Sequence, residues 1–220
     1  MNYFKLGALL LCLSSFSTSS FAADSASNRK DATLYLGIQP IGMDIPDLIG
    51  PTGHLGIGLG ENLIFGVEKN QPGALDEAAD SSFYYETQGY WLRLFTGNSF
   101  YFKLGYHQRK WQFRTSNQGL WLFGNINSLW EDVDGVTRGE AKLASFGFGN
   151  LWHFDSHFYL GVDWAVFTKP LSSSYSGDVV SYFGYGSDAE AQRAIEERAK
   201  LHHDVMTGPG LAVLTLGFYF

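Results

Sequence analysis

The sequence predicts an all-β protein, an eight-stranded antiparallel transmembrane β-barrel with short turns at one end, long loops at the other and one short helix in the last loop. Three observations support this fold class. The chain begins like a secretory leader, later segments alternate between apolar residues and small or ionisable ones, and the last segment ends in the aromatic residue Phe220. No segment is apolar for the roughly 20 residues that a membrane helix requires.

The first 22 residues have the composition of a signal peptide. A single charge, Lys5, precedes an apolar stretch from Leu6 to Phe16, and small residues lead to an expected cleavage point after Ala22. We therefore divide the chain into a signal peptide (residues 1–22), a polar periplasmic tail (23–31) and a barrel (32–220). The one cysteine, Cys12, lies in the leader, so we expect no disulfide in the mature chain.

The charge balance of the chain is acidic. The formal net charge of −7 becomes −8 when Lys5 leaves with the leader, and acidic residues concentrate in 76–80, 131–134 and 188–197. Binding to phosphate backbones requires clustered Lys and Arg, so nucleic acid is not an expected partner. We expect the acidic runs to lie in solvated loops.

The first three predicted strands have an aliphatic face opposite a face rich in glycine. The apolar residues are Leu34, Leu36 and Ile38 in segment 33–40, Leu55, Ile57 and Leu59 in 54–60, and Leu63, Phe65 and Val67 in 63–68. Such period-two alternation is typical of strands that lie between lipid and a barrel interior.

The next five predicted strands bring aromatic residues to the apolar face, and three of them place a charged residue, Arg93, Lys103 or Asp163, on the other face. They are segments 90–94, 100–107, 145–149, 158–164 and 212–220, the last with Ala212, Leu214, Leu216, Phe218 and Phe220 on its apolar face. Tyr90, Tyr106 and Trp164 then lie high on the lipid face, and Phe100, Phe158 and Phe220 lie low, which predicts two aromatic girdles.

The connections alternate between short and long. Short turns are expected at 60–62, 96–98 and 155–156, and long loops at 42–51, 70–81, 114–139 and 169–209. Short turns of such barrels face the periplasm and long loops face outward. Both termini are therefore expected in the periplasm of a bacterial envelope.

The last loop contains the predicted helix. Ser187 and Glu190 fit a capping box, Glu196 and Lys200 are spaced to pair on a helix, and Gly208 followed by Pro209 should end it. Its narrow apolar stripe, Ala191, Ala194, Ile195 and Ala199, indicates packing over the barrel mouth or another loop.

A soluble eight-stranded barrel of the lipocalin type is the main alternative fold. It would need charged residues outside and apolar ones around an inner cavity. Here the apolar face is too bulky to fill an eight-stranded interior, so the membrane interpretation is favoured.

These features resemble the small eight-stranded outer-membrane proteins, the superfamily of the OmpA membrane domain, OmpX and OmpW, over residues 33–220. The resemblance implies an outer-membrane location among lipid and lipopolysaccharide. It also implies that the barrel assembly machinery recognises the last strand through Leu214, Leu216, Phe218 and Phe220.

Four ionisable residues, Glu68, Arg93, Lys103 and Asp163, share the inward parity. Because an isolated buried ion costs several kcal/mol, we expect these charges to pair near the middle of the barrel and to plug it. The resemblance to the OmpA membrane domain implies a comparable interior network. Core packing is favoured over a gate or proton path.

The predicted function is an envelope structural role, or surface interaction of the extracellular loops with a ligand or surface. Residues 120–123 and 129–130 are unusually apolar for a loop and could form such a contact surface. A narrow OmpW-like conduit for small apolar molecules is one alternative.

A lipid A acyl-modifying enzyme is the other alternative. Its candidate residues, expected near the outer rim, are His54, Asp80, Ser81, Ser82 and His107. The known spacings are missing: His153 is not followed by a serine two residues later, and 24–31 is too short and polar for the amphipathic helix of the palmitoyltransferases. The histidines at 202 and 203 lack metal-site spacing, so no metal or other cofactor is predicted, and a non-enzymatic role is favoured.

Overall fold

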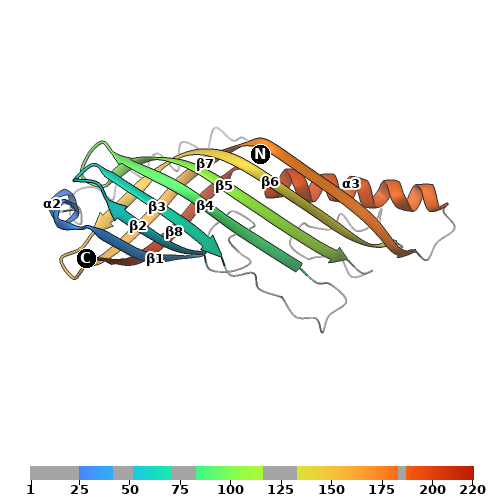
Figure 1. The fold of residues 1–220 in the computed structure, drawn as a ribbon, viewed down its shortest axis with the longest axis horizontal. Coiled ribbons are helices and arrows are strands. Elements are labelled where there is room, and N and C mark those ends of the chain that lie inside the picture. The colour runs from blue at the N-terminus through green and yellow to red at the C-terminus, as the bar shows by residue number, and fades with distance from the viewer. Residues whose placement is uncertain (1–24, 42–51, 71–82, 116–132, 183–186) are drawn as a thin grey trace, which may run out of the picture.

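The computed structural model describes residues 25–41, 52–70, 83–115, 133–182 and 187–220. Eight antiparallel strands follow one another around a closed barrel, and β8 pairs with β1 to complete it (Figure 1). The strands are Leu34–Ile41 (β1), Thr52–Gly58 (β2), Leu63–Asn70 (β3), Phe83–Phe95 (β4), Phe100–Thr115 (β5), Val133–His153 (β6), Phe158–Tyr182 (β7) and Gly210–Tyr219 (β8). The predicted eight-stranded antiparallel barrel is confirmed.

The two ends of the barrel differ. At the turn end, short connections join β2 to β3, β4 to β5 and β6 to β7, with Gly60 and His157 at positive φ. At the loop end, the wall is uneven because β1 to β3 have 7 or 8 residues, whereas β6 has 21 and β7 has 25. On one side of the barrel, the longer strands extend far beyond the loop ends of the shorter ones (Figure 1).

The long strands correct two expected loop boundaries. The segments 133–139 and 169–182, expected in loops, continue β6 and β7 as a paired hairpin. The outward face of this extension carries polar residues, for example Arg138 and its cross-strand neighbour Ser176, and the inward face carries Thr137 and Gly177, so the period-two signal disappears while the backbone pairing continues. Alternating hydropathy therefore marks only part of each strand and not its end.

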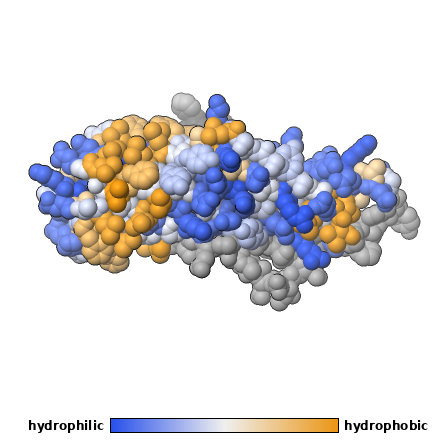
Figure 2. Space-filling model, in the orientation of Figure 1, coloured by the Kyte–Doolittle hydropathy of each residue, from blue (hydrophilic) through white to orange (hydrophobic). Residues whose placement is uncertain are grey.

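Side chains alternate as predicted in the part of the barrel near the turn end. Outward residues such as Leu36, Leu55, Phe102 and Leu104 are 38–54% exposed, whereas their inward neighbours are buried. Figure 2 shows this apolar surface over the barrel near its turn end, with hydrophilic surface on either side. The band therefore covers only part of the length of the molecule.

One detail of the last strand differs from the expected pattern. Ala212 has a φ of 54°, and the parity of β8 changes there, so that Leu211 is the exposed residue instead. Below this point Leu214, Leu216 and Phe218 face outward as expected. A left-handed residue inside a strand leaves no hydropathy signal, so alternation could not locate it.

The helix α3 (Asp188–Met206) lies along the inner side of the β6–β7 extension. Its capping box forms as predicted, with Ser187 accepting from the Glu190 N–H and the Glu190 carboxylate accepting from the Ser187 N–H at 2.8 Å. Ile195 is fully buried, and a Cβ on Gly135 would overlap its side chain, so glycine permits this close approach. The helix ends at a Thr207 cap, before Gly208 and Pro209.

A second helix, α2 (Ser25–Asp31), closes the turn end, where sequence analysis expected only a polar tail. Arg29 is buried, donates to the backbone carbonyls of Glu61, Asn98 (2.7 Å) and Gly97 (3.2 Å), and lies 3.8 Å above the Phe95 ring. The helix is held by polar contacts and not by an apolar stripe, so its sequence carries no amphipathic pattern. Neither helix in the described part of the chain is long and apolar enough to cross a membrane.

Candidate functional site

The inward side chains form two apolar layers with a polar layer between them. The turn-end layer contains Ala32, Tyr35, Ile64, Trp91, Phe95, Tyr101, Leu151, Tyr159 and Tyr219, and the loop-end layer contains Tyr85, Trp111, Phe113, Ala141, Leu143 and Met206. Along β5 the inward residues pass from Tyr101 through Lys103, His107 and Arg109 to Trp111. The polar layer is therefore enclosed from both ends.

The four predicted interior charges all lie in this enclosed region. Glu68, Arg93, Lys103 and Asp163 are 8%, 2%, 4% and 0% exposed. Lys103 Nζ is 2.9 Å from Asp163 Oδ2 and 4.0 Å from Glu68 Oε2, so one ammonium group lies between two carboxylates. Tyr101 donates its hydroxyl proton to the other oxygen of Asp163. A buried ion pair with these additional hydrogen bonds is the arrangement that offsets the desolvation of its charges.

Arg93 is held differently from the other three charges. It is the direct cross-strand neighbour of Lys103, and its guanidinium lies 4.6 Å from the Trp91 ring centroid and 4.9 Å from that of Tyr101. A guanidinium is attracted to the faces of aromatic rings, most of all when water is absent. The two aromatic faces and the nearby carboxylates thus stabilise a pair of neighbouring cations.

Glu68 continues the network through His107 to Ser145. His107 Nδ1 is 2.8 Å from Glu68 Oε1, and His107 Nε2 is 2.7 Å from Ser145 Oγ. Ser145 was not among the predicted site residues, because only its inward parity is visible in the sequence and its position across from Gly105 depends on strand register. The carboxylate, imidazole and hydroxyl follow one another in the order found in acyl-transfer enzymes.

The surroundings of this Glu68–His107–Ser145 chain are tightly packed. All three side chains are buried, and a Cβ on Gly105 would overlap both Ser145 Oγ and His107 Nε2. A nucleophile needs space beside it for the reacting carbonyl. The arrangement fixes the orientation of the His107 ring and satisfies buried polar atoms, which is a packing role.

The two acyl-enzyme candidates within the described residues point into the barrel and not to an outer rim. His54 and His107, expected there, are buried in the barrel interior, where His54 hydrogen-bonds the Tyr159 hydroxyl. Like Glu68, both histidines lie on the inward face of their strands. The face that a residue occupies decides whether its side chain points into the barrel, and its distance from the turns does not. Asp80, Ser81 and Ser82, like the apolar segments 120–123 and 129–130, lie outside the described residues. Within the described residues no cluster of metal-ligating side chains is found.

The loop end of the lumen is closed by the end of α3. Met206 is fully buried in the loop-end layer, and its carbonyl accepts from Arg109 Nη1 at 2.7 Å. His202, one turn earlier, stacks on Phe113 with ring centroids 4.2 Å apart, and its Nδ1 lies 2.7 Å from Thr137 Oγ1. Burial, with a smaller contribution from the Arg198 charge, lowers the pKa of His202 to about 4.

The predicted girdle and assembly residues lie on the outer surface. Tyr90 is 57% exposed and stacks on Phe65, Phe218 and Phe220 are exposed, and the remaining positions, Phe100, Tyr106, Phe158, Trp164, Leu214 and Leu216, are half-buried. Trp164 Nε1 donates to Asn150 Oδ1 at 2.8 Å, so its polar atom has a partner. Recognition of the last strand by the assembly machinery stays a prediction.

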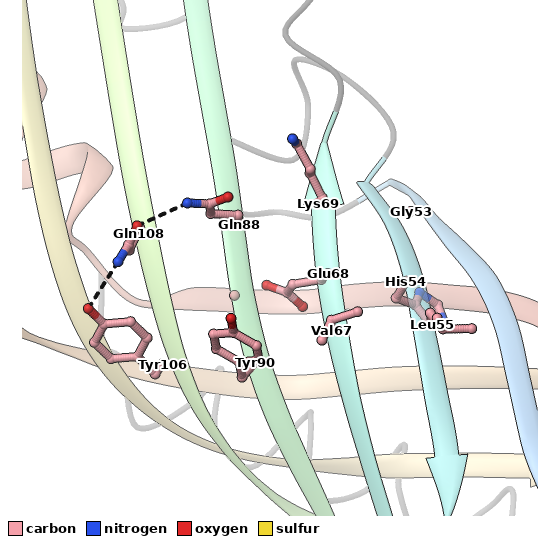
Figure 3. Close-up of a pocket in the computed structure, with 11 residues that line it drawn as sticks. Gly53, His54, Leu55, Val67, Glu68, Lys69, Gln88, Tyr90, Tyr106 and Gln108 are labelled. Carbon is pink, nitrogen blue, oxygen red and sulfur yellow. Dashed lines mark hydrogen bonds between the residues drawn. The ribbon is translucent and has the colours of Figure 1, made fainter.

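The same outer surface has a hollow on β2 to β5 of about 510 Å³ (Figure 3). Its outward lining includes Lys69, Gln88, Tyr90, Tyr106 and Gln108, whereas Glu68 and His54 belong to the strands that form its floor. Gln88 donates to Gln108 at 3.0 Å, and Gln108 donates to the Tyr106 hydroxyl at 3.3 Å. This hollow lies where the apolar surface changes to polar.

No protein-family model matches this chain, and no curated protein does either. Among solved structures the chain is similar to two proteins of Acinetobacter baumannii. It is 12% identical to CarO2 and 14% identical to CarO, with a TM-score of 0.42 and coverage of 86% of this chain and 98% of the other in both cases. Similarity at this level does not assign the chain to a family or an activity.

Proposed function

We propose that this chain is an outer-membrane β-barrel protein with a plugged interior, which serves an envelope structural role or a surface interaction through the part that extends beyond the membrane. The observation that carries the proposal is the apolar outer face of the barrel. Its exposed members include Leu36, Ile38, Leu55, Ile57, Phe65, Leu94, Phe102, Leu104, Phe146 and Phe218. Soluble monomers rarely expose a continuous apolar surface of this extent, because each Å² costs roughly 25 cal/mol in water.

The orientation in the membrane follows from the unequal ends. Short turns, α2 and Phe220 lie together at the turn end, where Thr33 N donates to the Phe220 carbonyl at 2.6 Å. The long hairpin and α3 lie at the other end. In barrels of this type the short turns face the periplasm, so we assign the turn end to the periplasm and the loop end to the cell surface.

The packed side chains of the interior support a closed barrel over the conduit alternative. Two apolar layers and the polar layer between them lie along the interior, with α2 at the turn end and Met206 at the loop end. An eight-stranded barrel is just wide enough for side chains to fill it. The enclosed Ser145 likewise favours a packing role for the Glu68–His107–Ser145 chain over acyl transfer.

Fractionation and conductance test this proposal. The full chain should be found in the outer-membrane fraction of a Gram-negative host, and the purified protein should give no stable conductance steps in planar bilayers, since the plug leaves no continuous water path. A periplasmic location would contradict the membrane assignment. Reproducible channel openings would contradict only the plugged interior, and they would favour the alternative function as a narrow conduit.

The surface interaction is the less specified part of the proposal. Tyr84, Leu171, Tyr175 and Val180 are exposed on β4 and β7 above the apolar band. Exposed aromatic and aliphatic side chains on a rigid sheet suit contact with a macromolecule or an abiotic surface. Cells that carry the protein should adhere better than cells carrying Tyr84→Ser/Tyr175→Ser at equal surface abundance.

A further inference from the structure

The outer face of β3 to β6 carries two adjacent rows of side chains with different chemistry, here called the border rows. In the apolar border row Val67, Tyr90, Tyr106 and Ala144 are successive cross-strand neighbours. In the polar border row, one step toward the loop end, the corresponding neighbours are Lys69, Gln88, Gln108 and Lys142. The change from apolar to polar thus occurs within one step along four strands.

Two hollows follow the polar border row. The first, of about 510 Å³, is the one in Figure 3, and the second, of about 520 Å³, is lined by Gln108, Lys142, Ser172 and Ser174 among others. Gln108 belongs to both. Lys110 and Glu140 also line the second hollow. Amides, hydroxyls and charged side chains therefore line two hollows on the outside of the barrel that meet at Gln108.

Positive charge is placed at the two ends of this row. At one end is Lys69, and at the other Lys142 lies beside Lys169, which is the cross-strand neighbour of Ala144. None of the three forms an ion pair with another residue of the described ranges. Lys110, one step further toward the loop end, is instead placed between Glu86 and Glu140. Neighbouring lysines without a counter-charge repel each other, and an anion between them removes that cost.

The spacing of these charges limits what can bind. Lys69 and Lys142 are three strands apart, which is about 14 Å at the usual distance between strands. This separation suits a headgroup with two separated anionic groups better than a single phosphate, which both side chains reach only when they extend toward each other. Beyond the row, the sheet continues with Gln112, Arg138, Ser174 and Ser176, a hydrogen-bonding surface suited to sugar hydroxyls.

We propose that the border rows bind a phosphorylated glycolipid of the outer leaflet. Its anionic groups contact Lys142 with Lys169 at one end and Lys69 at the other, its sugars lie over Gln88 and Gln108, and its acyl chains descend along the apolar border row. The inference rests on the proposed membrane location and orientation, because only then do the rows coincide with the headgroup level of that leaflet.

Native mass spectrometry of the full-length mature protein, released from detergent, tests this site with three lipids. Diphosphorylated lipid A should be retained more than monophosphorylated lipid A, and phosphatidylglycerol least. Lys142→Gln/Lys169→Gln should weaken retention of diphosphorylated lipid A about tenfold, and Lys69→Gln should weaken it while reducing the preference for the diphosphorylated form. The matched control, Lys30→Gln/Lys200→Gln, removes two exposed charges from α2 and α3 and should bind as the parent does.

Three results would overturn the inference. They are equal losses in the site and control variants, equal retention of phosphatidylglycerol, and complete displacement of lipid A by millimolar inorganic phosphate, which would indicate a simple phosphate site. Outer-membrane fractionation separates the two proposals. A protein that fractionates correctly but binds lipid A regardless of these lysines contradicts the site and leaves the proposed function standing.

Discussion

The side chains inside the barrel show how two adjacent cations can be buried side by side. Arg93 and Lys103 face each other across β4 and β5, which alone would be unfavourable. Glu68 and Asp163 come from β3 and β7, so neutrality is reached only when distant strands close around the lumen. The network therefore links barrel closure to charge compensation.

Removing one partner of the central pair tests this account. Lys103→Met should lower the free energy of unfolding by about 3 to 5 kcal/mol, because Asp163 would stay buried without its ammonium partner. Lys103→Met/Asp163→Asn should cost less than the sum of the two single changes. Urea titration of the folded fraction in lipid vesicles measures this, with the exposed Lys110→Met on the same strand as control. Strict additivity would show that the pair is not coupled.

Polar contacts join both helices to the barrel. Arg29 connects α2 to two of the turns, and Arg109 connects the end of α3 to β5. Each contact uses carbonyls that strands and helices leave free at their ends. α2 has no apolar stripe and relies on such contacts, whereas α3 also buries Ala191, Ile195 and Ala199 against the β6–β7 extension.

Arg29→Met should release α2 from the turn end while the barrel stays folded. The buried guanidinium donates to three carbonyls, and methionine can replace its bulk but none of those bonds. Hydrogen exchange at residues 25–31 should become faster, whereas exchange in β4 to β7 should not change. Lys30→Met, at the exposed neighbouring position, is the control. Unchanged exchange in α2 would mean that other contacts suffice to hold it.

Acidification should loosen α3. The pKa of His202 is about 4 in the folded protein, below the ordinary value of 6.5, so the undocked helix binds a proton more readily than the docked one. The stabilisation is complete above pH 6.5 and is lost as the pH falls toward 4. Protease sensitivity of residues 187–209 should rise over that range, and less so in His202→Phe, which keeps the stack on Phe113 without a titrating group. An equal rise in that variant would assign the effect to other groups.

At the scale of the whole molecule, what could be predicted is set by the difference between the two faces of each strand. An apolar outer face and side-chain packing inside impose alternation on residues such as Leu104 and Lys103, so the strands, their order and the inward charges could be predicted. The extension of β6 and β7 has solvent on one face and α3 on the other. Its residues therefore do not alternate between apolar and polar, and the sequence did not predict it. The chain from Glu68 to Ser145 was missed because it depends on register between β3, β5 and β6, which a single sequence does not contain.

Assembly gives a prediction at this scale. Deletion of Phe220 should lower the amount of folded barrel in the outer membrane severalfold, because the terminal aromatic residue is part of the expected assembly signal. The folded form is measured by its faster migration in unheated gels. Phe158→Leu, a change to another girdle residue, should have a smaller effect. Equal amounts of folded protein with and without Phe220 would refute the recognition role.

Because β7 has 25 residues and β8 only 10, the part of β7 toward the loop end is not paired with β8. Within the described chain β7 pairs with β8 only as far as Val166 and Gly210, so its later residues present backbone donors and acceptors on that side. Such edges invite strands from other molecules. Lys169 adds a charge there, Pro170 removes a donor, and Gln192 of α3 occupies the Gly177 carbonyl at 3.0 Å. The tallest part of the molecule thus carries its own protection against fibril-like self-association in a crowded membrane.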